Sequence, residues 1–139
     1  MAAEIRNLRD RAGESEKITI NLGFVDLGHI DLLVREGFYS NRTDFIRTAI
    51  RNQLGVHADA MKQSIVRNTL ELGLHRLSRE DLEAVRAEGG KLRIHVLGLT
   101  VIADDVTPEL ALATIDSIVV LGALHASKAV KAALADRIG

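Results

Sequence analysis

The chain lacks cysteine altogether, contains a single proline, and has few aromatic residues, 3% of the total. Without cysteine it cannot form a disulfide, a thiolate metal site or a cysteine nucleophile, and such a composition is typical of the reducing cytoplasm. Because aromatic side chains are so few, Leu, Ile, Val and Ala must fill the core that an apolar fraction of 47% allows. A length of 139 residues suits one domain, or two small ones that share a core or a dimer interface.

Long apolar runs are missing as well. The longest, near residues 94–103 and 118–126, are interrupted by Gly, His or Thr and are shorter than the roughly 20 residues of a membrane-spanning helix. The first residues carry no apolar stretch of the kind found in signal peptides. The sequence therefore predicts a cytoplasmic protein without a membrane partner.

Charge of one sign is not in excess either, because the formal net charge is −1. This balance argues against bulk attraction to nucleic acid, although the placement of the charges matters more than their sum. Arg42, Arg47 and Arg51 lie in one predicted helix, with Asp44 as the only acidic residue among them. A dimer of such chains can present a local basic ridge despite a neutral total.

Sequence patterns typical of enzymes are absent: there is no glycine-rich phosphate loop and no Ser/His/Asp signature. Asp104 and Asp105 precede a predicted helix start at Thr107, where acidic side chains favour the positive end of a helix, so we interpret them as structural rather than catalytic. The histidines are scattered, and a metal site built from His95 and His125 is an alternative to a role for them at an edge or interface. We expect no enzyme activity, no metal and no cofactor.

What the chain does contain is a short alternating segment at residues 17–22. Ile18, Ile20 and Leu22 would form the apolar face of a strand, and the residues between them its polar face. Such a strand cannot be stable alone, because its edge groups stay unpaired and its apolar face has no cover. The segment therefore predicts a second chain.

Two amphipathic helices are predicted after this strand. The first spans about residues 26–36 and is stopped by Gly37. The second follows Asn41, whose side chain can accept the backbone N–H of Asp44, and ends at Gly55. With the strand, the apolar stripes of these helices give an expected dimer core, formed by Ile18, Ile20, Leu22, Ile30, Phe45, Ile46 and Ile50.

An antiparallel pairing of residues 17–22 with their copy in a second chain gives a two-stranded ribbon. The apolar face of this ribbon lies on four helices and its polar face turns outward, and such a ribbon fits the major groove of B-DNA. There Lys17 can donate to guanine, Asn21 can pair with adenine, and Thr19 can hydrogen-bond or touch a thymine methyl group. We therefore predict that these three side chains read bases.

The start of the second helix is a candidate phosphate site. Free backbone N–H groups from about Asn41 to Asp44 can hold a phosphate, and the helix dipole adds attraction. Arg42 and Arg47 add positive charge. The predicted phosphate-binding residues are Ser40, Asn41, Arg42, Thr43 and Arg47.

The runs Lys-Ile-Thr-Ile-Asn-Leu at 17–22 and Arg-Glu-Gly-Phe-Tyr-Ser-Asn-Arg-Thr-Asp-Phe-Ile-Arg at 35–47 resemble the ribbon-helix-helix superfamily of DNA-binding proteins, the Arc/MetJ/CopG group. The resemblance covers about residues 16–55. It implies an obligate homodimer that reads operator DNA with its ribbon, and hence a role in transcription regulation, commonly as a repressor.

Residue by residue, the outward strand positions of the family match Lys17, Thr19 and Asn21. Its phosphate-anchoring helix start matches the run from Ser40 to Arg42. Gly23 stands where the family often has proline, and Gly28 lies inside the first helix, which implies a looser first helix rather than another fold.

The remainder of the chain carries a repeat. Residues 56–77 are predicted to be helical and are followed by a capped helix at Ser78. The run Ile-His-Val-Leu-Gly-Leu at 94–99 then recurs 24 residues later as Ile-Val-Val-Leu-Gly-Ala, and each copy leads to a helix, capped at Thr107 and at Ser127. Helix–strand units of this length are typical of a small solenoid-like stack.

We therefore predict an α+β protein in four segments. These are a flexible arm at 1–15, a ribbon-helix-helix DNA-binding domain at 16–55, a helical connector at 56–90, and an α/β repeat domain at 91–139 for oligomerisation or partner binding. A regulatory domain in this position resembles the nickel-responsive repressors, but their cysteine is missing here, so we reject nickel sensing.

The predicted function is sequence-specific, DNA-binding transcription regulation by a dimer or a higher assembly. Two alternatives stay open. One is an antitoxin, since many antitoxins combine this N-terminal fold with a toxin-wrapping tail. The other is a self-assembling scaffold that uses the ribbon only to dimerise.

Overall fold

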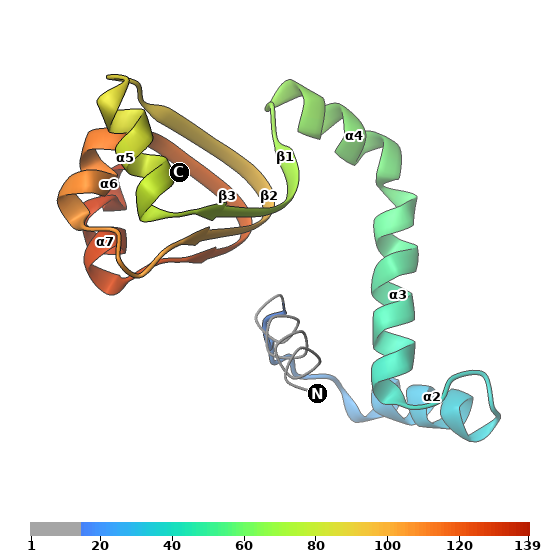
Figure 1. The fold of residues 1–139 in the computed structure, drawn as a ribbon. Coiled ribbons are helices and arrows are strands. Elements are labelled where there is room, and N and C mark those ends of the chain that lie inside the picture. The colour runs from blue at the N-terminus through green and yellow to red at the C-terminus, as the bar shows by residue number, and fades with distance from the viewer. Residues whose placement is uncertain (1–14) are drawn as a thin grey trace, which may run out of the picture. The chain divides into compact units, whose positions relative to one another are not determined.

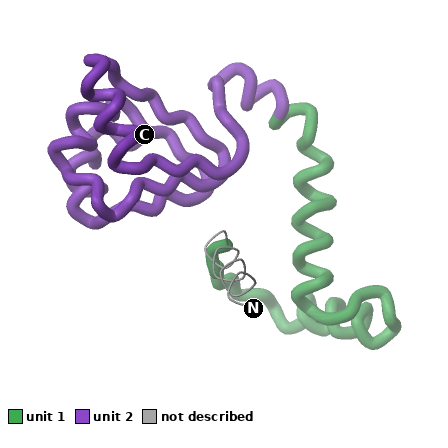
Figure 2. The backbone as a smooth tube through the Cα atoms, in the orientation of Figure 1, with its two compact units in different colours: residues 1–61 green, residues 62–139 purple. Residues whose placement is uncertain are grey.

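The computed structural model describes residues 15–139 and divides the chain into two compact units, residues 1–61 and 62–139 (Figure 2). The flexible arm predicted for residues 1–15 lies, apart from Ser15, outside the described residues. Helices α2 (Phe24–Arg35) and α3 (Arg42–Val56) belong to the first unit, and α4 (Ala58–Arg67) leads from the first into the second. Mixed α and β structure, the class predicted from the sequence, is confirmed.

Helix α2 ends where the sequence predicts. Gly37 has a φ of 84°, a backbone conformation that glycine adopts without strain. The backbone N–H groups of Gly37 and Phe38 bond back to the carbonyls of Val34 and Leu33 at 3.1 and 3.0 Å, which satisfies the last turn of the helix.

Helix α3 continues through the glycine that was predicted to end it. The helix extends to Val56, and the backbone N–H of His57 bonds to the carbonyl of Leu54 at 3.1 Å. The predicted stop at Gly55 is therefore wrong. Glycine inside a helix costs roughly 1 kcal/mol relative to alanine, which the rest of a long helix can tolerate.

Residues 15–23 form no strand in the single chain. The antiparallel ribbon predicted for residues 17–22 is thus not part of this structure, whose sheet is parallel and lies in the second unit. The physical reason is the one that predicted a second chain: a strand without a neighbour has nothing to bond with.

The second unit alternates strands and helices along the chain (Figure 1). Its three strands pair in parallel in the order β1-β2-β3. The elements are β1 (Glu71–Leu77), α5 (Arg79–Ala87), β2 (Leu92–Ile102), α6 (Pro108–Thr114), β3 (Ile115–His125), α7 (Lys128–Ala133) and the 3₁₀ helix η1 (Ala135–Arg137).

The prediction that residues 56–77 are helical, within a helical connector at 56–90, is wrong for its last part. Helix α4 ends at Arg67, Thr69 adopts a left-handed φ of 52°, and strand β1 begins two residues later. The signal for a strand is the alternation of Leu70, Leu72 and Leu74, which has a period of two and not the helical period.

The predicted internal repeat is in register in the sheet. Ile94 pairs with Ile118 and Gly98 with Gly122, as the 24-residue spacing requires. Gly73 pairs with Gly98, so β1 is a further copy that sequence comparison missed. Helix starts predicted at Ser78, Thr107 and Ser127 are also confirmed, since each side-chain oxygen accepts the backbone N–H three residues on, at 3.1 to 3.2 Å. A solenoid-like stack stays a prediction.

Each strand bends near its middle, and α5, α6 and α7 lie together across from the bend (Figure 1). The core lies between the strands and these helices. Its fully buried side chains include Leu82, Val96, Ile102, Ala111, Ile115, Ile118, Val130 and Leu134.

Two glycines of the sheet stand where no side chain fits. Gly98 and Gly122 have φ angles of 144° and 124°. A Cβ atom added at Gly98 would overlap the carbonyl oxygen of Gly73, and one added at Gly122 would overlap that of Gly98. The parallel strands approach each other closely along this column of glycines, so the register of the sheet depends on it.

Replacing Gly98 by alanine should therefore lower the free energy of unfolding by about 2–4 kcal/mol, through overlap with the neighbouring strand and backbone strain. Gly89→Ala is the matched control, because Gly89 also has a positive φ, 70°, but no atom lies within 4 Å of an added Cβ. That control should cost only about 1 kcal/mol. Urea unfolding measures both, and equal losses would contradict the importance of the glycine column.

Candidate nucleic-acid interface

The start of α3 is closed by a reciprocal pair of hydrogen bonds. Asn41 has an extended backbone, and its Oδ1 accepts the backbone N–H of Asp44 at 2.8 Å, as the sequence predicts. In return, the backbone N–H of Ser40 donates to Oδ2 of Asp44 at 2.9 Å. The start of the helix is therefore fixed at a defined residue.

This cap changes which groups are available to a phosphate. The N–H of Asp44 is occupied, and its carboxylate adds negative charge beside the helix start. What is left in the first turn are the backbone N–H groups of Arg42 and Thr43, which have no partner within the helix. A phosphate site here would use these two donors and the helix dipole.

Arg42 is held by a carboxylate that the sequence reasoning missed. Its Nε and Nη2 donate to the two oxygens of Asp31 in α2, both at 2.8 Å. These hydrogen bonds hold the pKa of Asp31 below its ordinary value and raise the pKa of Arg42. Both side chains are about half exposed, 55% and 52%, so the pair orients the helices more than it stabilises the fold.

The loop between the two helices is fixed by an aromatic contact. The ring of Tyr39 packs edge-on against that of Phe45, with centroids 5.1 Å apart and planes at 89°. This is a preferred arrangement for two aromatic rings. It connects the loop to the first turn of α3 beside the cap.

The predicted DNA-contacting residues fall into two groups along the first unit. Four of the five predicted phosphate contacts meet at one helix start, from Ser40 to Thr43, and Arg47 is exposed further along α3. The three predicted base-reading side chains lie on the segment before α2, and all are exposed: Lys17, Thr19 and Asn21.

Most of the predicted dimer core is uncovered in the single chain. Only Ile30 is buried, and Phe45 and Ile46 are half-buried. The others are exposed, by 74% for Ile18, 60% for Ile20, 37% for Leu22 and 48% for Ile50. Further apolar side chains outside the predicted dimer core are exposed as well: Phe24, Val25, Leu32, Phe38, Leu54 and Val56. An apolar surface of this extent is typical of a protein–protein interface.

Chemistry of other kinds has little support in the described part of the chain. Among residues 15–139, no three His, Asp or Glu side chains are grouped to hold a metal ion. In the sheet, His95 pairs with Val119 and His125 with Val101, so the two histidines are not opposite each other. Over the same residues, no helix combines the length and the apolarity needed to cross a membrane.

The Asp31–Arg42 pair predicts a pH dependence. Because the pKa of Asp31 in the folded chain lies below the ordinary value of 3.8, the pair contributes stability above that value and loses it as the pH falls through the lowered pKa. An NMR titration of the Asp31 carboxyl should show this pKa return toward the ordinary value in Arg42→Gln. Arg47→Gln is the control and should leave it unchanged. An Asp31 titration that does not respond to Arg42→Gln would contradict the assignment.

Comparison with known proteins extends the resemblance seen at residues 17–22 and at the α3 start. The model of the ribbon-helix-helix transcriptional regulator family matches residues 13–131. This match reaches well past residues 16–55 and includes most of the second unit. No curated protein and no solved structure matches the chain. Since the family model covers most of the sequence, the chain belongs to the ribbon-helix-helix transcriptional regulator family.

Proposed function

We propose that the chain is a sequence-specific DNA-binding transcriptional regulator of the cytoplasm, which acts as at least a dimer with a ribbon in the major groove. The observation that carries the proposal is the alternation at residues 17–22. Ile18 and Ile20 are largely exposed in a single chain, and so are the polar side chains between them. A second chain that covers the apolar face of this segment would account for the exposed isoleucines, and a ligand on the polar face would account for the exposed polar side chains.

The ribbon would form when two copies of residues 17–22 pair in antiparallel fashion. Their apolar face then covers the exposed side chains of α2 and α3, including Leu32 and Ile50. The outward face carries Lys17, Thr19 and Asn21 from each chain. A two-stranded ribbon can enter the major groove, where each base pair presents a distinct pattern of donors and acceptors.

The start of α3 would fix the position of the ribbon on the duplex. Backbone N–H groups of Arg42 and Thr43 are suited to one phosphate, and Arg47 adds an exposed cation for which the described residues supply no salt bridge. Arg42 contributes less charge than expected, because Asp31 neutralises it. Its main effect would be to hold α2 against the start of α3.

The second unit favours a regulator over an antitoxin. Residues 62–139 form a folded unit with a buried core. A toxin-wrapping tail is usually polar and unfolded when free, because it cannot bury enough apolar surface. We propose that this unit packs dimers together or presents a surface to a partner.

Replacing Lys17, Thr19 and Asn21 together by alanine should remove sequence preference and leave the dimer folded. The operator is first selected from random-sequence DNA with the unmodified protein. We expect the preference for that operator over random DNA, measured by gel-shift titration, to fall by a factor of about 1000 or more. Light scattering checks that the variant is still a dimer. Unchanged operator preference in a dimeric variant would rule out base reading by the ribbon.

Arg47→Gln should instead weaken binding to all DNA sequences alike. Each phosphate contact contributes about 0.9 to the slope of the logarithm of the binding constant against the logarithm of salt concentration. A dimer that loses two such contacts should therefore show a slope smaller by about 1.8. Arg86→Gln, which removes an exposed cation from α5 in the second unit, is the matched control. The proposed phosphate contact fails if both variants give the slope of the unmodified protein.

A further inference from the structure

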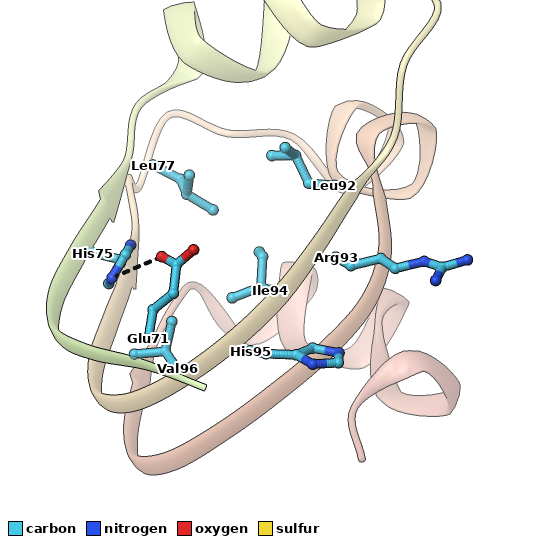
Figure 3. A pocket seen from close by; sticks show the side chains of 8 residues that line it. All are labelled: Glu71, His75, Leu77, Leu92, Arg93, Ile94, His95 and Val96. Atoms are coloured by element: carbon cyan, nitrogen blue, oxygen red, sulfur yellow. Dashed lines mark ion pairs between the residues drawn. The ribbon is translucent and has the colours of Figure 1, made fainter. Parts of the chain in front are cut away.

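The second unit is open at its β1 end. Strand β1 is an edge strand, and its side chains Leu72 and Leu74 are 65% and 41% exposed. A cavity of about 190 Å³ opens beside it, and its lining includes the side chains of Glu71 and His75 and the core residue Val96 (Figure 3). Stacked repeats normally carry a polar cap at their ends. Here core side chains face an opening instead.

Gly73 shows that this end can accept another strand. Its φ of 119° matches those of Gly98 and Gly122, 144° and 124°. At Gly98 and Gly122, a carbonyl oxygen of the preceding strand occupies the position that a Cβ atom would take. At Gly73, no atom lies within 4 Å of that position. Gly73 thus has the backbone of a residue that admits a neighbouring strand, and the place for that strand is empty.

The opposite end of the sheet is covered by the chain itself. Ile138 forms a parallel bridge with Ile118, and the N–H of Gly139 donates to the carbonyl of Ile118 at 2.8 Å. Arg137 anchors this segment through Nη1, which donates to the carbonyls of Leu112 and Ile115 at 2.7 and 2.8 Å. A head-to-tail stack would need this edge of β3, part of which is occupied. The β1 end is therefore better suited to meet another β1 end.

We infer that β1 pairs with β1 of a second copy of this chain, in antiparallel fashion, about a two-fold axis through Gly73. The strands bend near their middle (Figure 1). A two-fold axis along the bisector of this bend would place each half of one β1 on the other half of its partner. The interface is then isologous, with the same surface contributed by both chains.

The residues of β1 are self-complementary in this register. Leu72 lies opposite the partner's Leu74, and Glu71 opposite the partner's His75. Within one chain, Oε2 of Glu71 already lies 3.4 Å from Nε2 of His75 (Figure 3), so pairing would gather two carboxylates and two imidazoles over the paired openings. Apolar and oppositely charged cross-strand pairs both stabilise a sheet.

The β1 pairing rests on the proposed function in one respect only: the proposed dimer through the first unit brings two copies of β1 close together. A dimer formed through the first unit would hold two β1 edges at a high effective concentration, on the order of millimolar for a short link. The pairing itself depends on β1 alone.

The absence of cysteine allows a direct test in the full chain. An untagged Leu72→Cys chain is co-expressed with a tagged Leu74→Cys chain and mildly oxidised. Directly opposite residues of an antiparallel pair have Cβ atoms about 4.5–5.5 Å apart, close enough for a disulfide after small adjustment. We expect the mixed disulfide dimer on a non-reducing gel to exceed that of the control pair about tenfold.

The matched control is co-expression of Leu121→Cys with Ala123→Cys, because these positions share the sheet rows of Leu72 and Leu74 but lie on β3. Equal yields in the two pairs would overturn the inference. So would a dominant product from Leu72→Cys with Leu121→Cys, which indicates head-to-tail stacking.

Repeating the test with Ile18→Asp and Ile20→Asp separates the two proposed interfaces, since these changes prevent the ribbon. If only the ribbon proposal is wrong, the mixed disulfide still forms and light scattering of the unmodified and Asp-substituted chains gives the same mass. If only the β1 inference is wrong, the unmodified chain is a dimer by light scattering, and the Leu72→Cys and Leu74→Cys pair with an intact ribbon gives no more mixed disulfide than the control pair.

Discussion

The first unit is governed by an apolar surface that one chain cannot bury. Of the residues expected in its core, only Ile30 is buried, although α2 and α3 are fully formed and connected by the Asp31–Arg42 pair. Leaving a large aliphatic side chain exposed forfeits about 1.5–3 kcal/mol of burial energy. Several such side chains lie on the strand segment and on both helices. In the proposed function, association with a second chain would stabilise this unit, and DNA reading would depend on that association.

Local charge placement then matters more than total charge. The net charge is −1, so attraction between the whole protein and DNA is weak. Near the α3 start, Asp44 serves as a capping partner and Asp31 neutralises Arg42. In the proposed DNA complex, the groups left for phosphates would be the backbone N–H donors of Arg42 and Thr43 and the side chain of Arg47. Affinity for DNA would thus depend on geometry fixed by the cap and by the Tyr39–Phe45 contact, and on the number of chains joined.

Those features of the fold that depend on neighbouring residues in the sequence could be predicted from it. The Asn41 cap, the stop at Gly37 and the 24-residue repeat each follow from residue type and spacing, and each is confirmed. The strand β1 was missed because residues 56–77 were interpreted as helical, although Gly73 is the first of three glycines of positive φ that line up across the sheet. The Asp31–Arg42 pair was missed because it depends on the angle between two helices, which no local pattern specifies. The predicted ribbon would need two chains, so the structure of a single chain does not test it.

The two units share one feature. In each, the single chain leaves an edge segment unpaired, residues 17–22 in the first and β1 in the second. In both proposals a two-fold axis relates the segment to its own copy. If the same two chains pair through the ribbon and through β1, the β1 interface would stiffen the dimer. If β1 pairs with a chain of another dimer, it would join dimers, and each bound ribbon would raise the effective concentration of the next ribbon on DNA. For a protein with so little bulk positive charge, joining dimers is the more effective route to tight binding, because phosphate contacts add up along the duplex.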